Sequence, residues 1–308
     1  MILPICEDVC LKTLNCLAMP FSVLQSSNKF SYNYAFNKML SLYSKKKNIL
    51  LKDEKSMLVP HCFPFIFWRA LHFKVYLLHN EKNIKKIIIK SLQKRRYVYM
   101  GVNEEFIPER AAYKKAYFYH ELLIYGYDEL THKFYTIAFN DKLSYKTQLI
   151  DENEIINAYK SNKLRRFSLY NIWLRKNINF SYLNRDLIKL KIYFYCHPLR
   201  ENYGFKSYDC FCQQLKNDYR KKTLDIRSFR TIYDRAKILT QTPYINSILS
   251  PKTIDLINNN FAKSKILLKN AVKYLLTSDS EIEPILINDI KQFANNEREI
   301  LMSIFVNI

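Results

Sequence analysis

The sequence predicts an α+β fold in which an early helix packs on an antiparallel sheet and an all-helical part follows. Three observations predict it. Short β-branched and aromatic runs gather between residues 73 and 150, helical periodicities dominate after about residue 160, and 48% of the residues are hydrophobic, enough for a sizeable core. A chain of 308 residues accommodates two domains, which we expect at 1–165 and 166–308.

The first part should begin with a helix over Asn15–Gln25, where apolar residues recur at helical spacing. A charged loop, Lys45–Lys55, comes after it. Asp151 is typical of a helix N-cap, with Glu154 at the capping-box position, so a further helix starts there. Between them we expect an amphipathic helix over Asn83–Arg95 and strands at Phe73–Leu78, Tyr97–Val102, His120–Tyr127, Lys133–Phe139 and Ser144–Ile150.

The second part shows long helical periodicities and no internal repeat. Pro251 fits the first turn of a helix. We expect helices at Tyr182–Tyr195, Ser207–Tyr219, Ile226–Thr240, Pro251–Leu276 and Glu281–Val306. Helical parts of this kind often form dimers, so a homodimer is one open alternative.

The composition indicates the redox compartment and bears on secretion and membrane insertion. Seven irregularly spaced cysteines do not form a disulfide framework, which favours a reduced cytoplasm. The N-terminus carries Glu7 and Asp8 and lacks a basic region, so no secretory signal is expected. The most apolar stretch, Cys62–Trp68, is far below the ~20 residues of a membrane span. Three glycines are too few for a glycine-rich phosphate loop, which argues against nucleotide binding of that kind.

The net charge of +21 indicates an acidic partner. An equally weighted alternative is that the net charge reflects amino-acid composition alone, because Lys, Asn, Ile and Tyr are abundant, as in proteins from AT-rich genomes. The basic residues are spread along the chain, and no nucleic-acid-binding motif is recognisable. We therefore do not expect a nucleic-acid partner, although a non-catalytic basic binding or scaffold protein remains a rival hypothesis.

His120 is the most informative histidine, because it opens the most strand-like run of the sequence. A hairpin centred on Asp128–His132 places it opposite Asp141, with Cβ atoms ~4.5–5.5 Å apart. A shift of one residue puts Asn140 there instead. Such a pair supplies the base and the orienting group of a catalytic triad. A histidine that opens a strand is nevertheless more often structural.

A nucleophile is available at Cys16, where the apolar helix starts. First-turn N–H groups and the positive end of the helix dipole favour a thiolate there and can donate to a developing oxyanion. The commonest fate of a free cysteine is burial in a core, which is the plainer interpretation. Cys6 and Cys10 are rivals, but no amphipathic run starts directly after them.

A zinc site is the weaker alternative. Cys196 and His197 are adjacent, and Cys210 and Cys212 lie close by. Their spacing differs from that of usual zinc sites, and two cysteines two residues apart on a helix point to different sides. We expect no metal and no other bound cofactor.

These residues resemble the papain-like C39 peptidase superfamily, and more closely its butirosin-biosynthesis acyltransferase-like branch, many of whose members accompany nonribosomal peptide assembly lines. The likeness is carried by Cys16 at the start of the first helix, by His120 on a strand, and by the segments FIPERAAYKKAYFYHELLIYGYDE and FYTIAFND that surround it. The later segment LDIRSFRTIYDRAKIL, Leu224–Leu239, is similar to the helical C-terminal region of that group.

The resemblance implies a papain-like fold and a triad of Cys16, His120 and either Asp141 or Asn140. It also implies an acyl thioester on the phosphopantetheine arm of an acidic acyl or peptidyl carrier protein, and transfer of the acyl group through the cysteine to an amine acceptor. Arg110 is a weaker candidate for contact with the phosphopantetheine phosphate.

The sequence departs from the peptidase pattern in two places. The peptidases carry Gly beside the cysteine and a Gln about six residues upstream as an oxyanion donor, whereas Leu17 and Cys10 stand there in this chain. These departures weigh against peptide hydrolysis more than against thioester chemistry. A cysteine peptidase or amidase on the same residues is the first rival, and an inactive site is also consistent with them.

Overall fold

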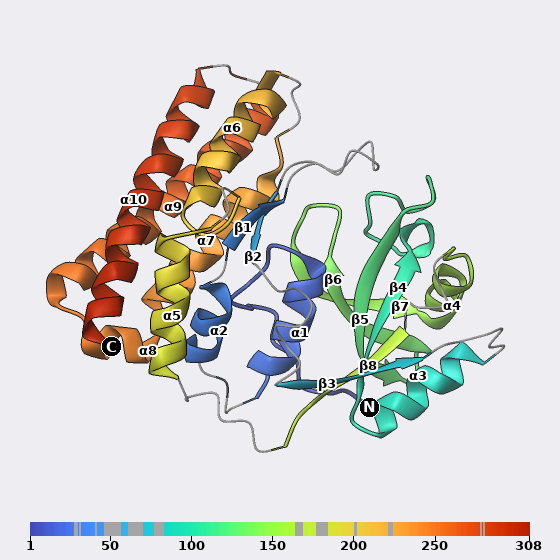
Figure 1. The fold of residues 1–308 in the computed structure, drawn as a ribbon. Coiled ribbons are helices and arrows are strands. Elements are labelled where there is room, and N and C mark those ends of the chain that lie inside the picture. Colours follow the sequence, from blue (N-terminus) through green and yellow to red (C-terminus); the bar gives the residue numbers. More distant parts are fainter. Residues whose placement is uncertain are drawn as a thin grey trace. The chain divides into compact units, whose positions relative to one another are not determined.

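The computed structural model describes residues 1–27, 30, 32–40, 42–45, 57–60, 70–76, 83–163, 169–176, 184–199, 202–220, 224–277, 279 and 281–308 (Figure 1). They combine helices with antiparallel sheet, which confirms the α+β class. The chain divides into two compact units, the first made of Met1–Phe30 and Pro64–Ile178 and the second of Ser31–Phe63 and Asn179–Ile308. The expected charged loop beyond Lys45 and the apolar stretch Cys62–Trp68 lie outside the described residues.

The first unit is built on one antiparallel sheet. Its strand order is β3-β8-β4-β5-β6-β7. The two strands in the middle of the sheet are buried at most positions, because helices cover both faces. The strands are β3 (Leu71–Tyr76), β4 (Tyr97–Asn103), β5 (Tyr119–Asp128), β6 (Lys133–Phe139), β7 (Tyr145–Asp151) and β8 (Leu169–Leu174).

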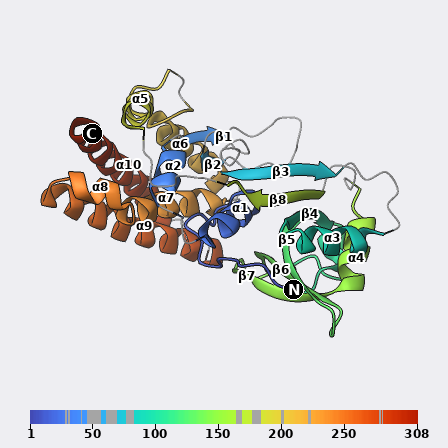
Figure 2. The ribbon, with the colours of Figure 1, turned by 90° about the horizontal axis from the view of Figure 1, so that it is seen from below.

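Helices cover both faces of this sheet, with α1 on one face and α3 and α4 on the other (Figures 1 and 2). Ser22 of α1 contacts the hydroxyl of Tyr145 at 2.8 Å. On the other side, the amide of Asn171 donates to Ser91 of α3 at 3.0 Å. The helices are α1 (Asn15–Gln25), α3 (Ile84–Gln93) and α4 (Glu152–Lys160).

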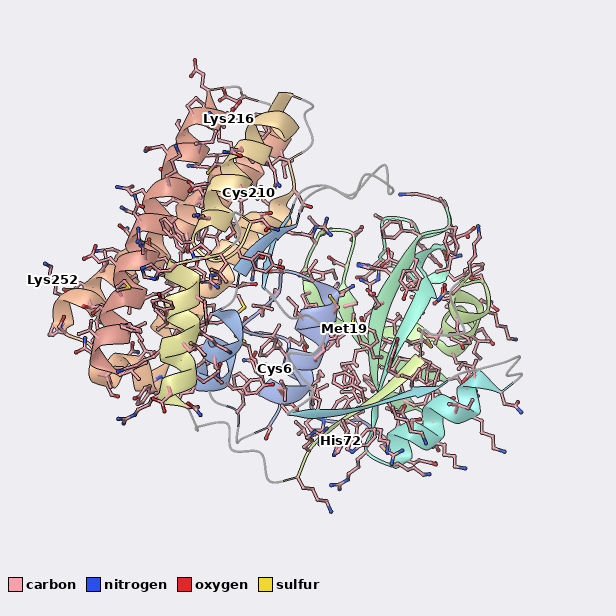
Figure 3. All side chains as sticks on the ribbon, in the orientation of Figure 1. Cys6, Met19, His72, Cys210, Lys216 and Lys252 are labelled. Atoms are coloured by element: carbon pink, nitrogen blue, oxygen red, sulfur yellow. The ribbon has the colours of Figure 1, made fainter. Side chains whose placement is uncertain are left out.

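Helix α1 has the bounds that the sequence predicts, and its apolar side chains, Met19 among them, are buried (Figure 3). The carbonyl of Leu14 accepts from the N–H groups of Leu17 and Ala18, which starts the helix. Pro20 has no N–H to donate to the carbonyl four residues earlier, so the helix lacks one ladder bond close to its start. Packing on the sheet, rather than capping, therefore holds the first turn.

Helix α4 begins as predicted, but its cap differs from a capping box. The carboxylate of Asp151 accepts from the N–H of Asn153 at 2.8 Å. Glu154 accepts from the hydroxyl of Tyr113 at 3.0 Å. The tertiary contact with Tyr113 thus engages the carboxylate that a capping box would turn back to the N-cap N–H.

The second unit consists of helices and a two-stranded antiparallel sheet. Helix α9 packs against α7 and α10. No helix in the described ranges has both the length and the apolar composition needed to cross a bilayer. The elements are α2 (Tyr32–Met39), β1 (Leu42–Lys45), β2 (Met57–Pro60), α5 (Arg185–Cys196), α6 (Lys206–Arg220), α7 (Ile226–Thr240), α8 (Pro243–Ile248), α9 (Pro251–Thr277) and α10 (Ile282–Asn307).

The division between the units differs from the expected domains 1–165 and 166–308. The strand β8 pairs with both β3 and β4, so the first unit extends past residue 165. Conversely, Ser31–Phe63 belongs to the second unit. The sequence pattern misses β8 because a polar residue, Asn171, stands in the middle of the strand, where its amide is satisfied by Ser91. The second unit is also not purely helical, since it includes β1 and β2.

A buried cluster in the second unit brings together polar side chains from four helices. Glu297 of α10 is fully buried, and its carboxylate accepts from the hydroxyls of Tyr195 and Tyr208 at 2.5 and 2.9 Å. Arg235 of α7 donates to the other carboxylate oxygen at 3.0 Å and also to the carbonyl of Met39. Each oxygen of the carboxylate thus has hydrogen-bond donors, as a buried charge requires.

Candidate active site

The candidate site lies where the start of α1 meets the start of β5, within the first unit. The ladder between β5 and β6 extends from Asp128 only as far as Leu123, so the first residues of β5 have no pairing partner on β6. The side-chain amide of Asn15 contacts this opened edge and donates to the carbonyl of Glu121 at 3.1 Å. The parting of β5 from β6 therefore brings the first turn of α1 to His120.

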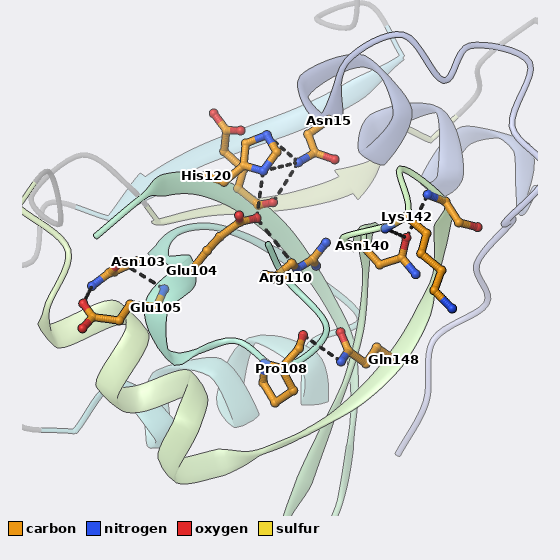
Figure 4. A network of polar contacts seen from close by, with 12 residues as sticks. Asn15, Asn103, Glu104, Glu105, Pro108, Arg110, His120, Asn140, Lys142 and Gln148 are labelled. Atoms are coloured by element: carbon orange, nitrogen blue, oxygen red, sulfur yellow. Dashed lines mark hydrogen bonds and ion pairs between the residues drawn. The ribbon is translucent and has the colours of Figure 1, made fainter. Parts of the chain in front are cut away.

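The imidazole of His120 contacts two polar side chains, those of Glu104 and Asn15 (Figure 4). Its Nδ1 lies 2.9 Å from Oε1 of Glu104. Nδ2 of Asn15 lies 3.1 Å from its Nε2 and 3.3 Å from its Nδ1. The histidine side chain is 36% exposed, whereas that of Glu104 is 9% exposed. The base is therefore reachable from solvent while its carboxylate partner is enclosed.

A short 3₁₀ helix after β4, η2 (Glu104–Phe106), positions this carboxylate. The side-chain oxygen of Asn103 accepts from the N–H of Glu105 at 3.2 Å and from the N–H of Phe118 at 3.1 Å. These bonds tie η2 to the segment that leads into β5. Glu104 is thereby held on the same side as the histidine ring.

Arg110 stands behind the carboxylate, with its Nε 3.8 Å from Oε1 of Glu104. Its side chain is only 4% exposed, so it is not the solvent-facing arginine that contact with a phosphopantetheine phosphate requires. Burial lowers the pKa of Arg110, and the charge of Glu104 opposes that effect. Its Nε and Nη1 atoms are buried and make no hydrogen bond, which is costly for a guanidinium.

Cys16 is the second residue of α1, directly after Asn15, and is half-buried. Burial raises the pKa of Tyr99 well above its ordinary value, and the neighbouring charges of Glu121 and Cys16 add to the effect. Asn15, the residue directly before Cys16, touches the ring of His120, so the start of α1 lies beside the histidine.

Polar aromatic residues surround the thiol side of the site. Tyr99 and Tyr170 pack edge to face, with ring centroids 5.8 Å apart. Burial raises the pKa of Tyr119 to about 12 and also raises the pKa of Glu121, which directly follows His120 in β5. A half-buried carboxyl group therefore lies beside the base without being its hydrogen-bond partner.

The two residues predicted to orient His120 lie elsewhere. Tyr127 faces Phe134 as the hairpin predicts, but a bulge between Ile124 and Gly126 shifts the register by one residue beyond that point. Placing Asp141 opposite His120 was therefore wrong. Pairing between the strands ends before either Asn140 or Asp141 is reached.

Asn140 and Asp141 instead form the turn from β6 to β7. The side-chain oxygen of Asn140 accepts from the N–H groups of Lys142 and Ser144, at 3.1 and 2.8 Å. Asp141 is exposed, and its N–H donates to the carbonyl of Glu109. Asn140 is thus engaged in a turn of its own.

Sequence reasoning missed both polar partners of His120. Glu104 is separated from His120 by a connection of irregular structure, so its proximity follows from the β4–β5 register, in which Val102 faces His120. Only that register places η2 beside the ring. Asn15 had a signal in the sequence, because it directly precedes the candidate nucleophile at a helix start, where amide side chains commonly bond to nearby groups.

The cysteines considered for zinc lie in the second unit. Cys196 is the last residue of α5, and Cys210 and Cys212 lie on α6. Burial raises the pKa of Cys196 to about 11 and that of Cys212 to about 12, which disfavours the thiolate that binds a metal. Over the described part of the chain, no group of three or more His, Cys, Asp or Glu side chains is arranged to hold a metal ion.

Comparison with models of known protein families finds no match, and comparison with curated proteins finds no match either.

Proposed function

We propose that this protein is a thiol-dependent acyltransferase with a papain-like active site, in which Cys16 is the nucleophile, His120 the base and Glu104 the orienting carboxylate. One observation carries the proposal. The imidazole faces a buried carboxylate through Nδ1 at 2.9 Å, and its Nε2 faces the start of the helix that bears the cysteine. An activated nucleophile needs this order of groups, in which a carboxylate orients an imidazole and the imidazole serves the thiol.

Each residue has a distinct part in the proposed chemistry. Glu104 keeps the proton of the neutral imidazole on Nδ1 and stabilises the imidazolium that forms when Nε2 takes the proton of Cys16. Arg110 supplies a cation next to that carboxylate. The first-turn N–H groups and the dipole of α1 favour the thiolate of Cys16.

The proposed reaction proceeds in two acyl transfers. The thiolate attacks the carbonyl carbon of an acyl thioester, a C–S bond to Cys16 forms, and the C–S bond to the leaving thiol breaks as His120 returns the proton to it. An amine then attacks the acyl-enzyme with His120 as general base, which forms an amide and regenerates the cysteine. Cys16 and His120 therefore return to their starting protonation states.

A thioester suits this site better than a peptide bond. Cys10, at the place where the related peptidases carry an oxyanion-donating Gln, is fully buried, and its N–H donates to Gln25 at 2.6 Å. A thiol is also a weak hydrogen-bond donor. Thioesters need less electrophilic assistance than amides, so the loss of the upstream glutamine weighs more heavily against peptide hydrolysis than against thioester chemistry.

We propose an acidic carrier protein as the partner that presents the thioester on its phosphopantetheine arm. The chain has 49 basic and 28 acidic residues, a net charge of +21. Side chains such as Lys216 and Lys252 point away from their helices (Figure 3). A positive surface accelerates encounter with an acidic protein, and the effect weakens as salt is added.

The test is intact-protein mass spectrometry after incubation with acyl thioesters. The wild-type protein should gain the mass of the acyl group, and a Cys16→Ala variant should gain nothing. A Cys6→Ala variant is the matched control, because Cys6 is another half-buried thiol of the first unit. It should acylate as the wild type does.

Added amines then separate transfer from hydrolysis, because the first yields an amide product and the second yields the free acid. Acylation of Cys16→Ala at the wild-type rate would rule out Cys16 as the nucleophile. An absence of any adduct on the wild type, with ordinary alkylation at Cys16, would instead favour a non-catalytic basic binding protein.

A further inference from the structure

The two nitrogens of the His120 ring have partners of opposite hydrogen-bonding character. An ionised carboxylate only accepts hydrogen bonds, so Nδ1, which faces Glu104 at 2.9 Å, carries the proton. An amide nitrogen only donates, so Nε2 accepts from Nδ2 of Asn15 at 3.1 Å. These partners assign the proton of the neutral imidazole to Nδ1.

The orientation of the Asn15 amide is fixed as well. Its Nδ2 donates to the carbonyl of Glu121 at 3.1 Å, and exchanging the nitrogen and oxygen would place two acceptors together. The same nitrogen lies 3.3 Å from Nδ1 of the ring, but the proton on Nδ1 points at Glu104, so Nε2 is the acceptor. One N–H of the amide is therefore held by the backbone and the other by the base.

Asn15 is enclosed at 4% exposure, and its Oδ1 atom is buried with no hydrogen-bond partner. A buried amide left half-satisfied is costly, and such atoms call for an explanation. At rest, this amide also occupies Nε2, the nitrogen that has to accept the proton of Cys16. The N–H of Asn15 therefore stays hydrogen-bonded to Nε2 of His120 until another acceptor replaces that nitrogen.

We propose that Asn15 is the side-chain oxyanion donor of the site, and that its N–H passes from Nε2 of His120 to the carbonyl oxygen of the acyl substrate. This inference rests on the proposed acyl transfer. The arriving carbonyl oxygen replaces Nε2 as acceptor, and Nε2 then takes the proton of Cys16. The thiolate adds to the carbonyl carbon, and the π electron pair moves to the oxygen that Asn15 holds.

When the intermediate collapses, that electron pair re-forms the C=O bond and the leaving thiolate takes the proton from Nε2. The amide then returns to the imidazole. Asn15 thus takes the place of the upstream glutamine of the related peptidases, where this chain has the buried Cys10. It also links activation of the thiol to the presence of a substrate carbonyl.

An Asn15→Ala variant tests the inference because two rates should change in opposite directions. Alkylation of Cys16 by iodoacetamide needs a free base and no oxyanion donor, so it should rise about fivefold, the equivalent of one neutral hydrogen bond lost from Nε2. Acylation by a thioester needs the donor, so it should fall about 100-fold. Peptide mass spectrometry measures both modifications at Cys16.

The matched control is Asn171→Ala. Asn171 is also a fully buried amide of the first unit, but it donates to Ser91, away from the site. Both rates should stay close to those of the wild type. An Asn15→Gln variant, which keeps the amide, should restore part of the acylation rate and provides a second test if the alanine variant melts early by circular dichroism.

The outcomes separate this inference from the proposed function. Wild-type protein that forms no acyl adduct contradicts both. An acylated wild type together with an Asn15→Ala variant that acylates equally fast overturns the role of Asn15 alone. A fall in both rates in Asn15→Ala, with no rescue in Asn15→Gln, shows a structural role and also overturns the inference.

Discussion

Each unit of this protein contains a buried arginine beside a buried glutamate, and the two pairs differ in how completely they are satisfied. In the second unit, Glu297 receives two tyrosine hydroxyls and Arg235, which also donates to a backbone carbonyl. In the first unit, Arg110 lies 3.8 Å from Glu104 and has two buried nitrogens without a hydrogen bond.

The difference separates two uses of buried charge. A satisfied network fixes the packing of the helices that supply its members, here α5, α6, α7 and α10. An incompletely satisfied one retains polar groups for another purpose, and such groups concentrate at functional sites. The pair in the first unit adjoins a half-exposed histidine, whereas the pair in the second unit is closed to solvent.

The largest effect is expected at Glu104. A Glu104→Gln variant keeps the size of the side chain but removes the charge that stabilises the imidazolium, so acylation of Cys16 should slow by about 100- to 10,000-fold. Glu105→Gln is the matched control, because Glu105 is the next residue and bonds to Asn103 instead of His120. Mass spectrometry of the acyl adduct over time measures both, and equal rates in the two variants would remove Glu104 from the mechanism.

The next largest effect concerns stability. An Arg235→Met variant leaves Glu297 buried without its cation, which should lower the free energy of unfolding by about 3–5 kcal/mol. The same change at Arg110 should lower it by only about 1 kcal/mol, since two nitrogens of that guanidinium make no hydrogen bond to lose. Urea denaturation followed by circular dichroism measures both losses, and equal losses would erase the contrast between the pairs.

The smallest effect is expected at Glu121. Burial raises the pKa of this carboxyl group in the folded protein, so the folded chain holds the proton more tightly than the unfolded chain. That contribution to stability is present below the unfolded pKa and is lost as pH rises through the folded pKa. Glu121→Gln should therefore melt above the wild type at pH 7, with a gap that closes toward pH 4; a gap that widens toward acid pH contradicts the assignment.

The prediction of elements from the sequence was right where periodicity is strong and local. Helix α1 and strand β6 have the predicted bounds, and α7 begins and ends at the predicted residues. The register bulge between Ile124 and Gly126 then moved His120 out of line with Asp141, because a slip of one residue changes every pairing beyond it. Local pattern carries no information about such a slip.

By itself, the sequence determined the α+β class and which residues begin the first helix and the histidine strand, because apolar spacing and strand propensity are properties of neighbouring residues. Only the tertiary structure decided which carboxylate faces the imidazole, since Glu104 reaches His120 through the pairing of two strands separated by a long connection. It also decided the place of Asn15, whose amide contacts β5 only because β6 parts from that strand at Leu123.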